Sequence, residues 1–318
     1  MSIRVVIADK LGDAGIALLA SSPEIHVVNL AGKPKEELDQ ALTTATALIV
    51  RSETRVTAEM IDRAPNLKVV ARAGIGVDTI DVAAATRRGI AVMNAPGANT
   101  VSAAEHAIAL LLSLLRHIPE ASETMRQGGW DRKRFEGSEL RGKTLGVVGL
   151  GRIGGYVAQV AHAFGMSILA YDPFVAPQRA VELQARLLPI EQLLQESDIV
   201  TLHVALTEET RHLLNAQRLK LMKATAFLVN TARGELVDEL ALVSAVKEKR
   251  IAGAAIDVFA EEPLPKDSPL RGLDRVLLTP HLAASTAEAQ KRVAIEICTA
   301  VRDALLRGDL STAINLKK

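Results

Sequence analysis

The chain has 318 residues, enough for two domains of roughly 150 residues that each bury a hydrophobic core. Its 48% hydrophobic and 24% charged residues exclude wholesale disorder. The 38 Lys and Arg nearly balance the 37 Asp and Glu, so the chain lacks the excess of positive charge that binds nucleic acid or a membrane surface. The aromatic content of 3% argues against surfaces that stack on nucleic-acid bases. The single cysteine, Cys298, argues against disulfides and thiolate metal clusters, so we expect the protein to lie in the reducing cytoplasm and to bind no metal.

Short β-branched segments alternate with helical patterns along the chain, which predicts an α/β fold with parallel strands. The first strand lies in an apolar run too short for a secretory leader. In the first third we expect strands at 4–8, 25–28, 47–50, 68–71 and 90–92, with helices that include 35–43 and 57–64. These segments make up one small doubly wound unit.

A long Ala/Leu helix begins near residues 99–105 and marks the first domain boundary. Its apolar stretch, 107–115, is far shorter than the ~20 residues that cross a bilayer, so we interpret it as a buried helix and expect no membrane partner.

A second series of strands is expected at 144–149, 167–171, 198–203, 226–230, 254–258 and 276–279. The last helix, about 285–306, has no further strand to join, so we expect it to pack on the first domain. The sequence thus predicts two doubly wound, Rossmann-like or flavodoxin-like domains with a cleft between them. Their expected extents are 1–98 with 286–318, which makes the first domain discontinuous, and 99–285.

Strand 144–149 runs directly into a Gly-Leu-Gly-Arg-Ile-Gly turn and then a helical pattern, which is the dinucleotide-binding fingerprint in its required context. The first glycine permits a tight turn, the second lets the backbone approach a pyrophosphate, and the third allows close packing of helix on strand. The pyrophosphate would lie on free amides at the helix start. The predicted cofactor contacts in this turn are Gly149, Gly151, Arg152, Ile153 and Gly154.

Asp172 ends the next strand, near the distance of about 20 residues at which an acidic residue accepts hydrogen bonds from the adenine ribose. A carboxylate there repels a 2′-phosphate, and the following Pro173 and Phe174 supply no arginine to attract one. The sequence therefore favours NAD over NADP and makes 99–285 the NAD-binding domain. Residues 1–98 and 286–318 are then the expected substrate-binding domain.

Three charged side chains follow later strands of the same sheet, where ligands of parallel sheets bind. Arg233 is a cation suited to a carboxylate, His281 is a base with an ordinary pKa near neutrality, and Glu262 is an acid that could pair with it. Together they are suited to moving the proton that accompanies hydride transfer. Taken singly, each has an ordinary structural interpretation: a turn cation, a helix cap and a solvated acid.

In the first domain, polar groups follow two adjacent strands. Two arginines with nearby hydroxyls are suited to one anionic group, and the amides of a glycine-rich turn to a second, so a substrate with a phosphate and a carboxylate would satisfy both. Ordinary surface arginines and a turn are the alternative interpretation. The residues concerned are Arg51, Ser52, Thr54, Arg72, Gly74, Ile75 and Gly76.

With these motifs the sequence resembles the D-2-hydroxyacid dehydrogenase family over essentially the whole chain. The segments that carry the resemblance are 50–54, 72–78, 94–105, the glycine turn, 230–234, 257–263 and Pro280-His281. It implies catalytic roles for Arg233, Glu262 and His281. The implied cofactor contacts include Thr231, Ala232 and Asp257, the last near the nicotinamide amide.

The resemblance also implies how the first domain meets the substrate. Arg51, Ser52, Thr54 and Arg72 would approach it, and Gly74, Ile75, Gly76 and Asn99 would lie along its carboxylate. Arg132 would reach the site of a neighbouring subunit in a homodimer or homotetramer, since the segment around the long helix is commonly the dimer contact in this family.

Within this resemblance, the arginines point to a phosphorylated small-molecule substrate. The resemblance therefore implies NAD-dependent oxidation of D-3-phosphoglycerate to 3-phosphohydroxypyruvate, the entry step of serine synthesis. Two alternatives stay open: a reductase of glyoxylate, hydroxypyruvate or another small 2-keto acid, and an NAD-sensing, corepressor-like interaction protein. Many relatives carry proline where this chain has Ala205, and longer ones continue into a serine-sensing domain. Serine feedback is therefore not expected unless the chain is truncated.

Overall fold

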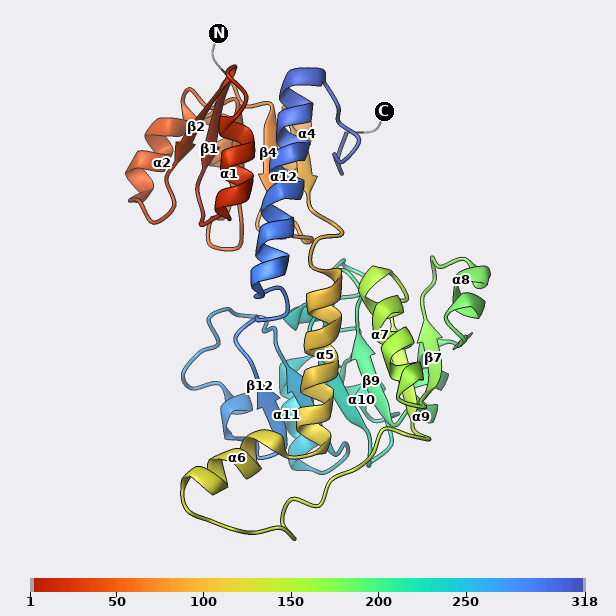
Figure 1. Cartoon of the computed structure of the whole chain (residues 1–318). Coiled ribbons are helices and arrows are strands. Elements are labelled where there is room, and N and C mark those ends of the chain that lie inside the picture. Colours follow the sequence, from red (N-terminus) through yellow and green to blue (C-terminus); the bar gives the residue numbers. More distant parts are fainter. Residues whose placement is uncertain (1–2, 317–318) are drawn as a thin grey trace. The chain divides into compact units, whose positions relative to one another are not determined.

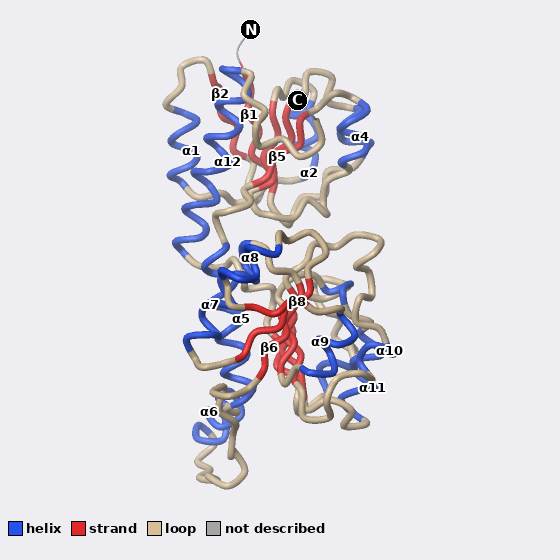
Figure 2. The backbone as a smooth tube through the Cα atoms, turned by 90° about the vertical axis from the view of Figure 1, so that its right-hand side faces the viewer, coloured by secondary structure: helices blue, strands red, loops and turns tan. Residues whose placement is uncertain are grey.

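A computed structural model describes residues 3–316, and the chain divides into two compact units, residues 1–99 with 285–318 (unit 1) and residues 100–284 (unit 2). Each unit is a parallel sheet covered by helices, which confirms the α/β class and the doubly wound architecture (Figures 1 and 2).

Unit 1 contains a five-stranded parallel sheet in the order β2-β1-β3-β4-β5. Its strands are Ile3–Ile7 (β1), Ile25–Asn29 (β2), Ala47–Val50 (β3), Val69–Arg72 (β4) and Ala91–Asn94 (β5). Its helices are Asp13–Ala20 (α1), Lys35–Leu42 (α2), Ala58–Asp62 (α3), Val82–Arg87 (α4) and Ala287–Arg307 (α12). The central strand β3 is buried at every position, as expected for a sheet covered on both faces.

The C-terminal helix α12 packs in unit 1, against α1 and the strands β4 and β5 (Figure 1). Its apolar side chains, such as Val293 and Ile297, join the core on one face of the sheet, while α2, α3 and α4 supply the core on the other face. The contact with α1 is close, because a Cβ added at Gly15 would lie 2.5 Å from the carbonyl oxygen of Ala294.

Unit 2 contains a seven-stranded parallel sheet in the order β12-β11-β10-β9-β6-β7-β8. Its strands are Thr144–Val148 (β6), Ser167–Tyr171 (β7), Ala185–Leu187 (β8), Ile199–Leu202 (β9), Phe227–Asn230 (β10), Gly253–Ile256 (β11) and Val276–Leu278 (β12). The strand order reverses direction between β6 and β9, the place where doubly wound sheets bind their ligands.

The helices of unit 2 are Thr100–Leu115 (α5), Ile118–Arg126 (α6), Arg152–Ala163 (α7), Pro177–Glu182 (α8), Ile190–Glu196 (α9), Ala216–Leu219 (α10) and Glu239–Lys247 (α11). Short 3-10 turns occupy Gly234–Leu236 and Pro269–Gly272. Helices α5 and α7 lie on one face of the sheet, and α9, α10 and α11 lie on the other (Figure 2). Within residues 3–316, no single helix is long and apolar enough to cross a membrane, although the bent pair α5 and α6 meets that criterion when taken together.

The structure differs from the sequence prediction chiefly at β8, an edge strand of three residues that the sequence analysis did not predict. The segment contains Arg186 and has no buried residue, so it lacks the apolar run that revealed the other strands. The remaining strands end within about two residues of their predicted limits, the usual uncertainty of element boundaries.

Candidate active site

The glycine turn follows the carboxyl end of β6, and its backbone conformation suits the binding of a dinucleotide. Gly149 has a φ of 93°, a left-handed conformation that side chains disfavour, and a Cβ there would lie 2.7 Å from the carbonyl oxygen of His203. A Cβ at Gly154 would lie 1.9 Å from the oxygen of Gly149, so the helix cannot approach the strand with any larger residue. At Gly151, by contrast, a Cβ would meet nothing within 4 Å, and this open backbone begins the 12-residue helix α7. The turn therefore fits a cofactor pyrophosphate at the helix N-terminus.

Asp172 lies at the end of β7, beside the glycine turn. Its Oδ2 accepts a hydrogen bond from the amide of Leu150 at 2.8 Å, and its Oδ1 accepts from the amides of Phe174 and Val175 at 2.9 and 3.1 Å. The carboxylate is thus fixed against the turn, and its contact with an adenine ribose stays a prediction.

The loop after β10 presents Arg233. Buried Asn230 holds this loop, because its side chain donates to the carbonyl of Arg233 at 2.8 Å and accepts from the amide of Ala232 at 3.1 Å. A Cβ at Gly234 would lie 1.9 Å from the carbonyl carbon of Phe259, so only glycine lets this loop approach the loop after β11 so closely. The buried hydroxyl of Thr231 makes no hydrogen bond within residues 3–316 and remains available to a ligand.

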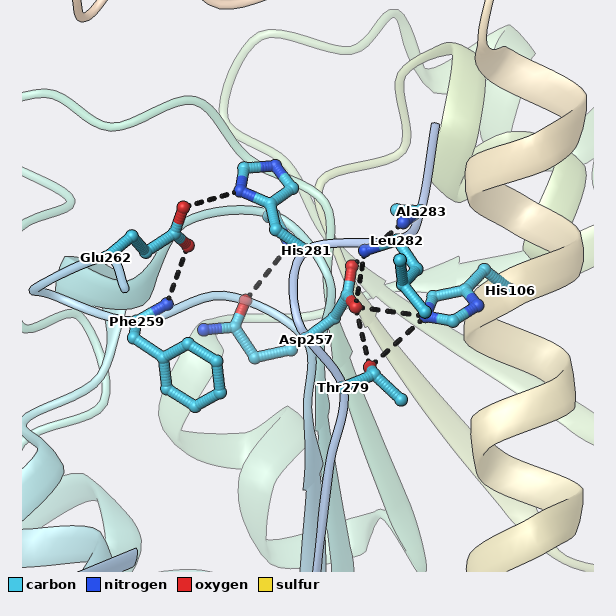
Figure 3. Close-up of polar contacts among 10 residues, drawn as sticks. His106, Asp257, Phe259, Glu262, Thr279, His281, Leu282 and Ala283 are labelled. Atoms are coloured by element: carbon cyan, nitrogen blue, oxygen red, sulfur yellow. Dashed lines mark hydrogen bonds and ion pairs between the residues drawn. The ribbon is translucent and has the colours of Figure 1, made fainter. Parts of the chain in front are cut away.

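His281 and Glu262 form a hydrogen-bonded pair at the same edge of the sheet (Figure 3). Nδ1 of His281 lies 2.7 Å from Oε2 of Glu262, and Oε1 of Glu262 accepts from the amide of Phe259 at 3.1 Å. The two side chains are 40% and 37% exposed, so the imidazole remains accessible to a small molecule. Because Nδ1 faces the carboxylate, Nε2 is the nitrogen left for a substrate.

The electrostatics of this pair favour an ionised Glu262. Partial burial raises the pKa of this carboxyl, but the hydrogen bond and charge of His281, the amide of Phe259 and the charge of Arg233 outweigh it and lower the pKa below 4.5. Arg233 therefore acts on the same carboxylate that orients His281.

Asp257 is fully buried beneath His281. Its Oδ1 accepts hydrogen bonds from Nε2 of His106, the hydroxyl of Thr279 and the amide of Leu282, and its Oδ2 accepts from the amide of Ala283 (Figure 3). Burial raises the pKa of Asp257, whereas these hydrogen bonds lower it and prevail. Both carboxylate oxygens of Asp257, a predicted cofactor residue, are thus already engaged by groups of the protein.

In unit 1, the loop that carries Arg51 and Thr54 is held by Asp9, which is 3% exposed. Oδ2 of Asp9 accepts from the amides of Arg51 and Thr54 at 2.5 and 3.1 Å, and Oδ1 accepts from the Thr54 hydroxyl. The Arg51 guanidinium donates to the carbonyl of Lys10 at 3.1 Å, and Ser52 is exposed. Both arginine and threonine side chains therefore already have protein partners.

The glycine turn of unit 1 adjoins Arg72, the last residue of β4. The guanidinium lies over Gly74, where an added Cβ would come within 2.3 Å of Nη1 of Arg72. The carbonyl of Ile75 accepts from the side chain of Asn94 at 2.5 Å, which fixes the turn that continues to Gly76. Asn99 contributes a buried Oδ1 with no hydrogen-bond partner among the described residues.

Arg132 lies elsewhere in unit 2, in the exposed loop after α6. This loop packs at the end of α5 near Leu115, whose carbonyl accepts from the amide of Ser138 at 3.1 Å, whereas His106 lies in the N-terminal half of that helix. The structure does not bring Arg132 to the His281 pair of its own chain, and its contact with a neighbouring subunit stays a prediction.

Sequence reasoning missed two groups, Asp9 and His106. Asp9 directly follows the apolar run of β1, so the search for polar residues past strand ends could have found it. His106 had no local signal, because its partner Asp257 is 151 residues away in the sequence.

Comparison with known proteins shows what this chain resembles. Residues 108–283 match the family model of the D-isomer specific 2-hydroxyacid dehydrogenase NAD binding domain. The chain is 45% identical to D-3-phosphoglycerate dehydrogenase of Synechocystis sp. and 48% identical to that of Mycobacterium bovis, and these matches cover 98% and 99% of the chain. They cover 56% and 60% of those relatives, so the chain spans less than two thirds of their length.

Solved structures agree in fold. The TT0316 protein of Thermus thermophilus is 39% identical with a TM-score of 0.88, and the match covers 98% of this chain and 100% of that one. A glyoxylate reductase of Paecilomyes thermophila is 30% identical with a TM-score of 0.89, and the match covers 98% of each chain. The chain belongs to the D-isomer specific 2-hydroxyacid dehydrogenases, and residues 108–283 are its NAD-binding domain.

Proposed function

We propose that the chain is an NAD-dependent dehydrogenase that oxidises D-3-phosphoglycerate to 3-phosphohydroxypyruvate. The observation that carries the proposal is the His281–Glu262 pair at 2.7 Å, set beside Arg233 on the sheet edge that holds the dinucleotide turn. The choice of substrate draws support from relatives of that name, which match 98–99% of this chain.

The chemistry assigns one task to each side chain. Bound NAD would accept the hydride from the carbon that carries the hydroxyl group. Nε2 of His281 takes the hydroxyl proton and returns it in the reverse direction, while Glu262 holds Nδ1 and stabilises the imidazolium. Arg233 binds the substrate carboxylate and steadies the charge on the reacting oxygen.

We assign the substrate phosphate to Arg51 and Arg72, with Ser52 beside them and the amides of Gly74, Ile75 and Gly76 for the carboxylate. Thr54 serves better as part of the loop than as a ligand, because its hydroxyl and amide are held by Asp9.

A second candidate is reduction of glyoxylate or another small 2-keto acid. It is favoured by the Arg51 contact with Lys10, which occupies part of the guanidinium that a phosphate would need.

NAD is the proposed cofactor in preference to NADP. The fixed carboxylate of Asp172 supports this assignment, since a 2′-phosphate would meet a negative charge there. Thr231 and Ala232 are the proposed contacts on the nicotinamide side, with the unpartnered Thr231 hydroxyl as the supporting observation.

We further propose a cytoplasmic homodimer or homotetramer. Exposed apolar side chains on α6 and the loop after it, Ile118, Met125 and Trp130, support a subunit contact there, close in sequence to Arg132. Burial raises the pKa of the Cys298 thiol to about 12, which leaves the one cysteine unreactive and agrees with a reducing compartment. Light scattering on the purified chain measures the oligomeric state, and a monomer would contradict this part of the proposal.

The test is NADH consumption with 3-phosphohydroxypyruvate, glyoxylate, hydroxypyruvate and pyruvate at one pH and salt concentration. We expect a strong preference for the phosphorylated acid. Preference for an unphosphorylated acid would keep the hydride chemistry and remove the phosphate assignment. Tight NADH binding without turnover on any acceptor would contradict the enzymatic proposal.

Variants in unit 1 distinguish the loss of a phosphate contact from a general loss of activity. Arg51→Ala is expected to lower kcat/KM for 3-phosphohydroxypyruvate by about 10- to 10²-fold, the loss typical of a charged contact, and to leave glyoxylate reduction within about two-fold. Arg55→Ala, at an exposed arginine of the same segment, is the matched control. An equal loss of kcat/KM on all acceptors would show that Arg51 supports the loop and does not bind the substrate phosphate.

A further inference from the structure

Three side chains outside the proposed proton-transfer pair meet beneath the His281 segment. His106 comes from α5, Asp257 follows β11 and Thr279 follows β12 (Figure 3). Nε2 of His106 lies 3.1 Å from Oδ1 of Asp257 and 3.3 Å from the Thr279 hydroxyl, which itself donates to the same Oδ1 at 2.6 Å. Two side-chain donors from two different elements thus converge on one carboxylate oxygen.

The carboxylate they hold faces the backbone of the His281 segment. The amides of Leu282 and Ala283 donate to the Asp257 side chain at 2.8 and 3.0 Å, and the amide of His281 donates to the Asp257 carbonyl at 2.8 Å. Three consecutive amides of the segment are therefore bound by a single residue.

The segment needs such support because His281 has a φ of 55°, in the left-handed region that residues with a side chain disfavour. A strained residue persists only where its surroundings over-determine it. If the Asp257 carboxylate turned away, the amides of Leu282 and Ala283 would lose their acceptors and the backbone could relax. The His281 ring would then leave its position beside Glu262.

His106 is the group that keeps the Asp257 carboxylate from turning. Asp257 is wholly buried, and an isolated buried carboxylate is unfavourable unless donors satisfy it. To donate to this oxygen, Nε2 of His106 must carry a proton, and the acidic acceptor selects that form. This hydrogen bond joins α5 to the edge of the sheet that carries His281, so the position of α5 helps to fix the position of the Asp257 carboxylate.

We propose that His106 is a positioning residue for the dehydrogenase reaction, acting through Asp257 to hold His281 in its left-handed conformation beside Glu262. The inference rests on the proposed function for its kinetic consequence. It differs from a role in cofactor binding, because it predicts a loss in turnover with NADH affinity retained.

The test compares His106→Leu, which removes the donor, with His106→Gln, whose amide nitrogen can donate to the carboxylate. His162→Leu, at an exposed histidine of α7, is the matched control. Four quantities are measured for each protein: kcat and KM for the preferred acceptor, the Kd of NADH by fluorescence, the melting temperature, and amide hydrogen exchange in peptides covering 279–284.

We expect His106→Leu to lower kcat at least ten-fold and to speed exchange at residues 282–283, with the Kd of NADH within two-fold of the wild type. His106→Gln should recover most of both losses, and the control should change neither. Unchanged exchange with His106→Leu, a kcat loss explained by weaker NADH binding, or a Gln variant no better than Leu would each overturn the proposal.

Two provisions keep the result decisive. Thr279→Val removes the second donor to Asp257 from a different strand end and should act in the same direction, so it tests the contact even if His106→Leu does not fold. Hydrogen exchange needs no substrate. If the wild type turns over none of the acceptors, the proposed function fails while the exchange data still decide whether His106 holds the segment.

Discussion

At the scale of single residues, His281 combines an accessible ring with a constrained backbone. Its ring is 40% exposed and its φ is 55°, so the side chain meets solvent while the main chain is held by Asp257. Such strain is common at functional sites. The consequence is that the ring can be removed with little loss of stability, because its main contact is the half-exposed Glu262.

We expect His281→Ala to lower kcat by about 10²–10⁴-fold, the usual contribution of a general acid–base group, while the Kd of NADH stays within a factor of about two. Steady-state kinetics and NADH fluorescence titration measure the two quantities. His212→Ala is a suitable control, since His212 is another exposed histidine with a left-handed φ, 49°. Equal losses of turnover and NADH affinity would mean that His281 is structural.

The second residue-scale prediction concerns cofactor choice. Asp172→Asn keeps the size of the side chain and an acceptor for the turn but removes the charge that repels a 2′-phosphate. We expect NAD to bind more weakly and the ratio of NADP to NAD affinity to rise by about ten-fold, equivalent to about 1.4 kcal/mol. Titration with both reduced cofactors measures this ratio. An unchanged ratio would remove Asp172 from the set of specificity residues.

At the scale of elements, the contact between α1 and α12 joins the two ends of the chain in unit 1. Gly15→Ala would push a Cβ to 2.5 Å from the backbone of Ala294, which cannot yield as a flexible side chain does. We expect a loss of about 1–3 kcal/mol, the range for overpacking a close contact. Thermal or urea unfolding of the full chain measures this loss.

Gly97→Ala is the control for that experiment, because its Cβ would meet only the end of the Glu296 side chain on the same helix, at 3.9 Å. A Gly15→Ala variant as stable as Gly97→Ala would mean that the two helices separate without loss and that α12 is not an integral part of the unit 1 core.

The elements also show how far sequence reasoning reaches. Buried strands such as Ala47–Val50 were predicted because both faces of a covered parallel sheet select continuous apolar runs. The edge strand Ala185–Leu187 was not, because an edge is partly solvated and its hydrogen bonds to β7 need no apolar side chains. The glycine turn was predictable in detail, since the backbone leaves no room for another residue at Gly149 and Gly154.

At the scale of the whole molecule, the sequence alone could not predict contacts between residues that lie far apart in the chain. That Arg233, Glu262 and His281 follow strands of one sheet could be inferred from the parallel pattern, because carboxyl ends of parallel strands share an edge. The network of His106 and Asp257 depends on where α5 crosses the sheet, and side-chain depth is set by packing on that face. The burial of the Asp257 carboxylate is therefore a feature of the site that only the structure reveals.

Two titratable groups with lowered pKa values, His203 and Asp257, make the stability of the whole molecule sensitive to acid. Burial lowers the pKa of His203 to about 4 from its ordinary 6.5, so between these values the unfolded chain binds a proton that the folded chain does not. Stability must then fall as the pH drops from 6.5 to about 4. Asp257 has a lowered pKa as well, so its contribution is complete above 3.8 and is lost as the pH falls further. The two groups act in adjoining pH windows and in the same direction.

The expected result is a melting temperature that declines from pH 7 to pH 4, followed by a second decline below pH 4, measured by calorimetry without cofactor. His203→Gln should flatten the first decline, because glutamine does not titrate, and should leave the second in place. His26→Gln, at an exposed position of β2, should leave both declines unchanged. If His203→Gln declined as steeply as the wild type between pH 6.5 and pH 4, the loss in that window would arise from other groups, and His203 would have to be protonated as readily in the folded chain as in the unfolded one.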